Sequence, residues 1–136
     1  MAEVWKKVAG MKFVAKLPTT MANGVESISA KDAHAFEVRI SRELIRRGSV
    51  NAEAFAFIRK AAKLKAAELA KMLDVDPKTV SRWETGEIKI PRSEWAVLAR
   101  LFSEKVGGRD EITIASALEA AAAPRNSRSE TIELRP

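Results

Sequence analysis

The chain has 136 residues, 46% of them hydrophobic and 31% charged, which suits one globular domain with short extensions. The lack of cysteine excludes disulfides and thiolate metal sites, and one histidine is too few for most other metal sites. The sequence has neither about 20 consecutive apolar residues nor a secretory leader, so we expect no membrane role. The formal net charge of +6 favours an anionic partner, nucleic acid first. The absence of cysteine fits the reducing cytoplasm, and no residue pattern calls for a metal or cofactor.

Residues 1–29 are the part of the chain whose structure the sequence specifies least. Met11–Leu17 alternates loosely between apolar and polar residues, which predicts a short strand. Asn23-Gly24 marks a turn, and it would close a hairpin between that strand and Val25–Ile28. Because a lone hairpin is marginal in water, we expect this segment to pack on something else, to pair with a second chain or to stay mobile.

A connecting helix is predicted within residues 30–50. Ser29 and Asp32 resemble a capping box, and Gly48 ends the helix after two arginines that suit its negative C-terminal end. Apolar residues recur on one helical face: Ala33, Phe36, Ile40 and Leu44. This helix is expected to pack against the domain that follows it.

Four short helices are predicted within residues 51–105. Their boundaries are set by caps and breakers: Asn51 before the first, Lys65 to Leu73 for the second, Asp76-Pro77 to Gly86 for the third, and Pro91 near the fourth. Each helix has apolar residues on one face, so we expect a shared core that includes Trp83 and Trp95.

The C-terminal part begins at the break formed by Gly107-Gly108. A helix is predicted within residues 106–123, where Ile114, Leu118 and Ala121 form an apolar stripe. The polar residues 124–136 are expected to be a disordered tail.

The second and third of the four short helices have the pattern of a helix-turn-helix. The two helices of such a motif cross steeply, and small residues at Ala66, Ala67 and Ala70 allow a close contact. The turn needs a backbone with positive φ, which Asp74 tolerates better than most residues other than glycine.

The sequence LKAAELAKMLDVDPKTVSRWETGEIKIP, residues 64–91, resembles the phage-repressor and Cro type of helix-turn-helix, the XRE-like family. The resemblance covers about residues 51–104 and implies a lambda-repressor-like bundle that binds double-stranded DNA. We therefore predict an all-α fold, with the connecting helix before the bundle and a small N-terminal element that is either β or irregular.

The resemblance also implies roles for individual residues. Base contacts are implied for Pro77, Lys78, Ser81 and Arg82, and Lys78 and Arg82 lie one helical turn apart. Phosphate contacts are implied for Arg59, Lys65, Thr79, Thr85, Lys89 and Arg92. The family pairs a first-helix arginine with a third-helix acid, here Arg59 and Glu84. Many members begin the second helix with Gln; here Ala66 stands there, and Lys65 is expected to take over its phosphate contact.

These features predict a sequence-specific transcriptional regulator that represses from a palindromic operator as a homodimer. Two candidate dimer interfaces are the helix around residues 110–123 and the N-terminal segment. No catalytic constellation is visible, so we do not expect an enzyme.

Two alternatives stay open. Residues 40–70, ISRELIRRGSVNAEAFAFIRKAAKLKAAELA, are similar to two-domain antitoxins whose helix-turn-helix follows a zinc-binding domain, although this chain lacks the cysteines of such a domain. An antitoxin would bind a partner toxin and autoregulate its operon. The second alternative is a protein–protein adaptor that has kept the fold and lost the DNA contacts.

Overall fold

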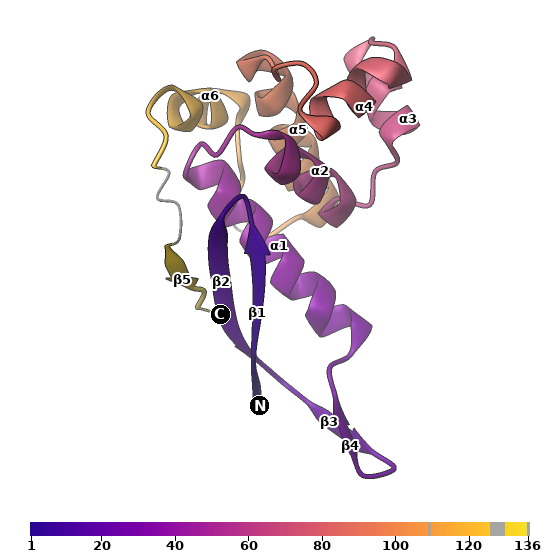
Figure 1. Ribbon diagram of the computed structural model, residues 1–136, viewed down its shortest axis with the longest axis vertical. Coiled ribbons are helices and arrows are strands. Elements are labelled where there is room, and N and C mark those ends of the chain that lie inside the picture. Colours follow the sequence, from indigo (N-terminus) through magenta and orange to yellow (C-terminus); the bar gives the residue numbers. More distant parts are fainter. Residues whose placement is uncertain (109, 126–129, 136) are drawn as a thin grey trace.

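The computed structural model describes residues 1–108, 110–125 and 130–135 (Figure 1). Its helices are α1 (Ala30–Arg46), α2 (Ala52–Ala61), α3 (Ala66–Leu73), α4 (Pro77–Thr85), α5 (Arg92–Val106) and α6 (Ile114–Ala122). Its strands are β1 (Ala2–Val8), β2 (Met11–Leu17), β3 (Thr20–Ala22), β4 (Val25–Ser27) and β5 (Thr131–Glu133). No helix in these described ranges is both long and apolar enough to cross a membrane.

The predicted fold is confirmed in part: the helical bundle and the helix before it are present, and the N-terminal element is β, but two small sheets among the described residues mean that the fold is not all-α. The strand predicted at Met11–Leu17 is confirmed as β2, and it lies between β1 and β5 in a three-stranded sheet. Strand β1 gave no clear signal because Trp5, Lys6 and Lys7 are three consecutive exposed residues, which hide the period of two.

Two tight turns shape the N-terminal segment. Ala9 and Gly10 have φ values of 55° and 80°, and this pair of positive values suits a two-residue hairpin turn that returns β1 into β2. The turn predicted at Asn23-Gly24 is present, but it joins β3 to β4 rather than β2 to residues 25–28. Strand β2 pairs with β1 instead, since β1 offers seven partner residues with matched apolar spacing.

The prediction of a disordered tail is wrong for residues 131–133, which form β5. This strand pairs in parallel with β2 and buries Ile132. The backbone N–H of Lys12 donates to the carbonyl of Glu130 at 2.9 Å, and that of Leu134 donates to the carbonyl of Val14 at 2.8 Å. The rest of the predicted tail includes residues 126–129 and 136, which lie outside the described residues.

An ion-pair cluster fastens the start of this strand to the end of α1. Arg47 donates to Glu43 Oε1 at 2.8 Å and to Glu130 Oε2 at 2.9 Å. Burial by itself would raise the pKa of the Glu43 carboxyl, but hydrogen bonds from Arg46 and Arg47 outweigh it and hold that pKa below its usual range. The carboxylate is therefore charged at neutral pH and available to hold Arg47 toward β5.

One core joins the sheet to the helices. The inner face of β2 presents Met11, Phe13, Ala15 and Leu17 to α1, whose Phe36, Ile40 and Leu44 are buried against it. The same core continues into the bundle, where the Phe55 and Trp83 rings meet edge to face with centroids 5.8 Å apart. In Figure 1 the strands β1 and β2 run up toward α2, while α3 and α4 lie beyond α2 at the far end. The sheet therefore lies in the middle of the molecule beside α1, where β1 contacts α2, and α3 and α4 lie at the end opposite the β3–β4 hairpin.

The end of α1 packs so closely on α6 that Gly48 is required there. Gly48 has φ +68°, and a Cβ at this position would overlap the backbone carbonyl of Ala120. Gly24 has a similar φ of +76°, but a Cβ there would have no neighbour within 4 Å. The two glycines thus share a left-handed backbone conformation and differ in the space around them.

We predict that Gly48→Ala destabilises the protein more than Gly24→Ala does. The left-handed backbone should cost either alanine about 1–2 kcal/mol. Overlap with Ala120 should add about 1–3 kcal/mol at Gly48 alone. Chemical denaturation of both variants measures the difference. Equal losses at the two positions would show that α6 moves away from α1 without cost.

Candidate nucleic-acid interface

Local sequence signals fix the geometry of the helix-turn-helix. Helix α3 ends at Asp74, whose φ of 56° and ψ of 47° place it in the left-handed region, as predicted. Helix α4 begins after Asp76, whose carboxylate accepts the backbone N–H of Lys78 at 2.8 Å. Gly86, with φ of 79°, ends the helix. Both ends of α4 are therefore set by residues within the motif itself.

Helix α4 has one buried and one exposed face. Val80 and Trp83 are buried against the bundle. The predicted base-contacting residues are all exposed: Pro77, Lys78, Ser81 and Arg82. Thr85 is exposed as well, while Thr79 is half-buried. The structure therefore brings the four predicted base contacts to the solvent side of one helix.

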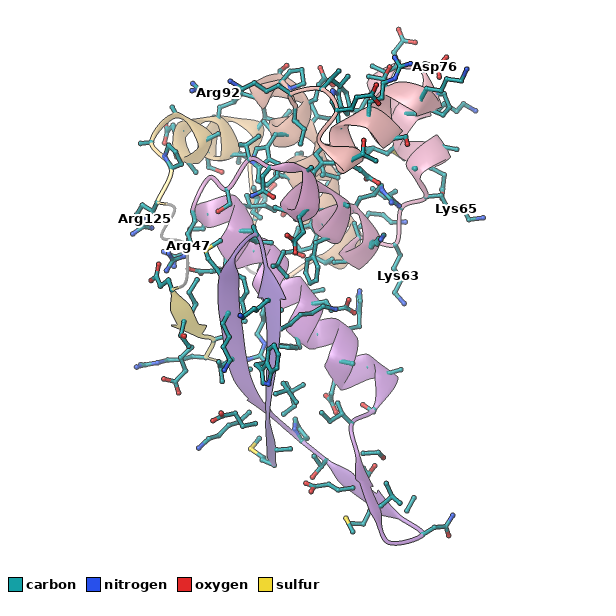
Figure 2. All side chains as sticks on the ribbon, in the orientation of Figure 1. Arg47, Lys63, Lys65, Asp76, Arg92 and Arg125 are labelled. Atoms are coloured by element: carbon teal, nitrogen blue, oxygen red, sulfur yellow. The ribbon has the colours of Figure 1, made fainter. Side chains whose placement is uncertain are left out.

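The other predicted phosphate contacts flank this helix. Lys89 and Arg92 are exposed, in the connection after α4 and at the start of α5. Figure 2 shows Arg92 and Asp76 at the same end of the molecule, with Lys65 projecting outward at its side. Lys65 precedes α3, where its backbone N–H donates to Glu68 Oε1 at 3.1 Å. Cationic side chains thus stand on both sides of α4.

Arg59 lies behind α4 rather than on its exposed face. Its Nε donates to Glu84 Oε2 at 2.6 Å and its Nη2 donates to Glu84 Oε1 at 2.9 Å, so the expected ion pair is present and bidentate. Its Nη1 donates to the carbonyl of Leu64 at 2.8 Å. The two side chains are only 12% and 14% exposed, so this pair acts first on the position of α4.

Glu87 is a residue of this surface that the sequence reasoning missed. Its Oε2 lies 3.8 Å from Arg82 Nε, and both side chains are more than half exposed. The left-handed turn at Gly86 folds the chain back, so that the Glu87 N–H donates to the carbonyl of Arg82 at 2.9 Å. An acid directly after the capping glycine was the available signal. In the free protein this carboxylate offsets part of the charge on Arg82.

The described residues contain no cluster of side chains that could bind a metal ion. In the ranges 1–108, 110–125 and 130–135, no three His, Asp or Glu side chains lie together as a bound cation would require. The single histidine, His34, is half-buried, and its Nε2 lies 2.8 Å from the carbonyl of Ala61. It therefore links α1 to α2.

Comparison with known proteins identifies the same segment as a helix-turn-helix. Residues 56–105 match the family model described as Helix-turn-helix, from the middle of α2 to the penultimate residue of α5. No curated protein and no solved structure showed a significant match to the chain. The match confirms the XRE-like resemblance of this segment and indicates a DNA-binding regulator of that type.

We predict that Arg59→Ala destabilises the fold. It would leave the Glu84 carboxylate and the Leu64 carbonyl without their partner, at a cost of up to about 3 kcal/mol, the lower end of the range for buried pairs. Thermal melting and DNA titration should both worsen. Lys60→Ala, at the next, exposed position of α2, is the control and should leave melting unchanged. Unchanged melting of the Arg59 variant would show that the pair adds nothing to stability.

We predict that Glu87→Gln strengthens DNA binding. The substitution removes the carboxylate beside Arg82 and one negative charge close to DNA phosphates, so affinity at low salt should rise about threefold to tenfold. Glu53→Gln, an exposed acid in the first turn of α2, is the charge-matched control. An equal gain for both variants would make the effect one of net charge only.

Proposed function

We propose that this chain, with its XRE-like helix-turn-helix at residues 56–105, represses transcription by inserting α4 into the major groove of an operator. Lys78 and Arg82 read base edges, with guanine O6 and N7 the preferred acceptors for Arg82. Pro77 and Ser81 complete the base-facing surface. Phosphates on either side are held by Lys65, Thr79, Thr85, Lys89 and Arg92. Arg59, which is bonded to Glu84 and to the Leu64 carbonyl, positions α4 from behind.

The observation that carries this proposal is the exposed face of α4. Its buried face is filled by Val80 and Trp83, and Glu84 is bound to Arg59. Lys78, Ser81 and Arg82 therefore have no role in the core, yet they sit on a helix whose position is fixed at both ends and from behind. Rigid placement of polar groups on a helix is what direct readout of a groove needs.

A homodimer on a palindrome is part of the proposal, because one such module reads only a few base pairs. Helix α6 is the candidate contact. It buries Ala117 and Ala121 in the protein but leaves Ile114 and Leu118 44% and 37% exposed. Two copies joined side by side through α6 would present both α4 helices to one duplex, about 34–36 Å apart.

An antitoxin is the second candidate function, and the position of the sheet favours it. The β1–β2–β5 sheet lies beside α1, apart from α3 and α4 (Figure 1), so a partner bound to it would leave the DNA surface free. Co-expression with the product of a neighbouring gene, followed by purification on an operator, separates an antitoxin from a solitary repressor. An adaptor without DNA contacts would fail to shift any DNA at low salt.

We predict that selection of bound sequences from random DNA recovers an inverted repeat, and that Arg82→Ala relaxes it at one position per half-site. The expected loss is about 1–3 kcal/mol per half-site on the selected operator. Binding is measured on that operator and on a scrambled duplex at one salt concentration.

Lys31→Ala is the control, since Lys31 is an exposed cation at the start of α1, away from α4. It should alter both affinities little and equally. A loss at Arg82 that is the same on operator and scrambled DNA would make Arg82 a phosphate contact and remove it from base readout.

A further inference from the structure

Strand β1 is an open edge of the three-stranded sheet. Among the strands that the structure describes the order is β1-β2-β5, so within them β1 has a paired neighbour on one side only. Its residues Glu3, Trp5, Lys6 and Lys7 are exposed, and the Trp5 side chain is 60% exposed. Trp83 and Trp95, in contrast, are buried. A seven-residue edge with an exposed tryptophan is long enough to pair with another strand.

The hydrogen bonds of β2 show which backbone groups of β1 face outward. Lys12 N–H and Val14 C=O bond to the β5 side, so the even-numbered residues of β2 point their backbone groups away from β1. Antiparallel partners alternate between bonded and non-bonded pairs. The β1 residues opposite Lys16, Val14 and Lys12 are Glu3, Trp5 and Lys7. Their N–H and C=O groups therefore point to the open edge.

We propose that β1 pairs with β1 of a second copy of this chain, antiparallel and centred on Trp5. In this register Trp5 lies opposite Trp5 of the second copy, and Glu3 lies opposite Lys7 at both ends. All three are positions whose backbone groups face the edge, so each pair can exchange two hydrogen bonds. The result is one six-stranded sheet with a twofold axis at Trp5.

Charge selects both the partner and the register. In the described residues, no ion pair involves Glu3 or Lys7, and Lys7 faces Lys12 across the hairpin. Pairing centred on Trp5 gives each Lys7 a carboxylate and each Trp5 an aromatic partner. Pairing centred on Lys6 would instead place that lysine opposite its own copy. Lysines on an edge normally oppose pairing, and Glu3 is the residue that offsets them here.

The twofold axis also decides what the association does. Antiparallel pairing reverses the strand direction, and the helix-turn-helix lies beyond the hairpin end of β1 and β2 (Figure 1). The two α4 helices would therefore lie beyond opposite ends of the joined sheet. Such a contact cannot place both helices on one operator. If α4 binds DNA as proposed above, pairing through β1 would link two separate duplexes.

Charge reversal and mixing test the pairing. Glu3→Lys and Lys7→Glu each place like charges at both ends of the strand pair, so each variant alone should self-associate about tenfold or more weakly than the unaltered chain. An equimolar mixture restores opposite charges at both ends and should recover the association. Sedimentation velocity gives the mass, and a blue shift of tryptophan emission with concentration reports burial of Trp5. Thermal melting of each variant alone shows that it is folded.

Cysteine substitution tests the register in a chain that has no cysteine of its own. Hydrogen-bonded antiparallel partners have Cα atoms about 5.5 Å apart, within reach of a disulfide. Trp5→Cys should therefore form a covalent dimer under mild oxidation. Lys7→Cys is the matched control on the same strand and face, and it should crosslink to Glu3→Cys in a mixture but not to itself.

Four results would overturn the proposal. Association beyond the α6 dimer of the proposed function that ignores both charge reversals would show that β1 does not pair with itself. Loss of association without recovery on mixing, or equal crosslinking of Trp5→Cys and Lys7→Cys alone, would exclude this register. Stable binding of a different protein that β1 reversals abolish, with no self-association, would make the edge a site for that protein. A chain that binds no DNA would refute the proposed function and leave the sedimentation and crosslinking results standing.

Discussion

The bidentate pair between Arg59 and Glu84 is the contact on which the placement of α4 depends. It joins α2 to the back of α4 and, through the Leu64 carbonyl, to the connection that leads into α3. With side chains only 12% and 14% exposed, neither charge has water as a ready substitute for its partner. The rotation of α4 about its own axis is thereby fixed, and with it the direction in which Lys78 and Arg82 point.

The β1–β2–β5 sheet gives the molecule a second exposed surface, separate from that of α4. Because β2 and α1 share the core with the bundle, the sheet cannot behave as a loose arm. The Arg47 pairs with Glu43 and Glu130 hold the last strand against the end of α1 in the same way. The sheet and the exposed face of α4 are therefore held on one shared core.

The site followed from the sequence more fully than the fold did. The signals for α3 and α4 are local: Asp74 for the left-handed turn, Asp76 for the cap and Gly86 for the end. With both ends known, helical geometry decides which residues lie outward, and Lys78 and Arg82 are among them. The sequence did not predict the role of Glu87, because its contact with Arg82 depends on the path of the chain after α4, and helical periodicity does not describe that path.

The sequence by itself determined the helix boundaries, the helix-turn-helix and its outward face, because caps, turns and apolar periodicity act within a few residues. Only the tertiary structure decided that residues 2–8 and 131–133 are strands on either side of β2. Neither segment has an alternation of apolar and polar residues that is strong enough to predict a strand. Each gains its backbone hydrogen bonds, and its burial of Val8 or Ile132, from partners that lie elsewhere in the chain. Strand pairing between distant residues is a property of the folded chain, and local sequence does not encode it.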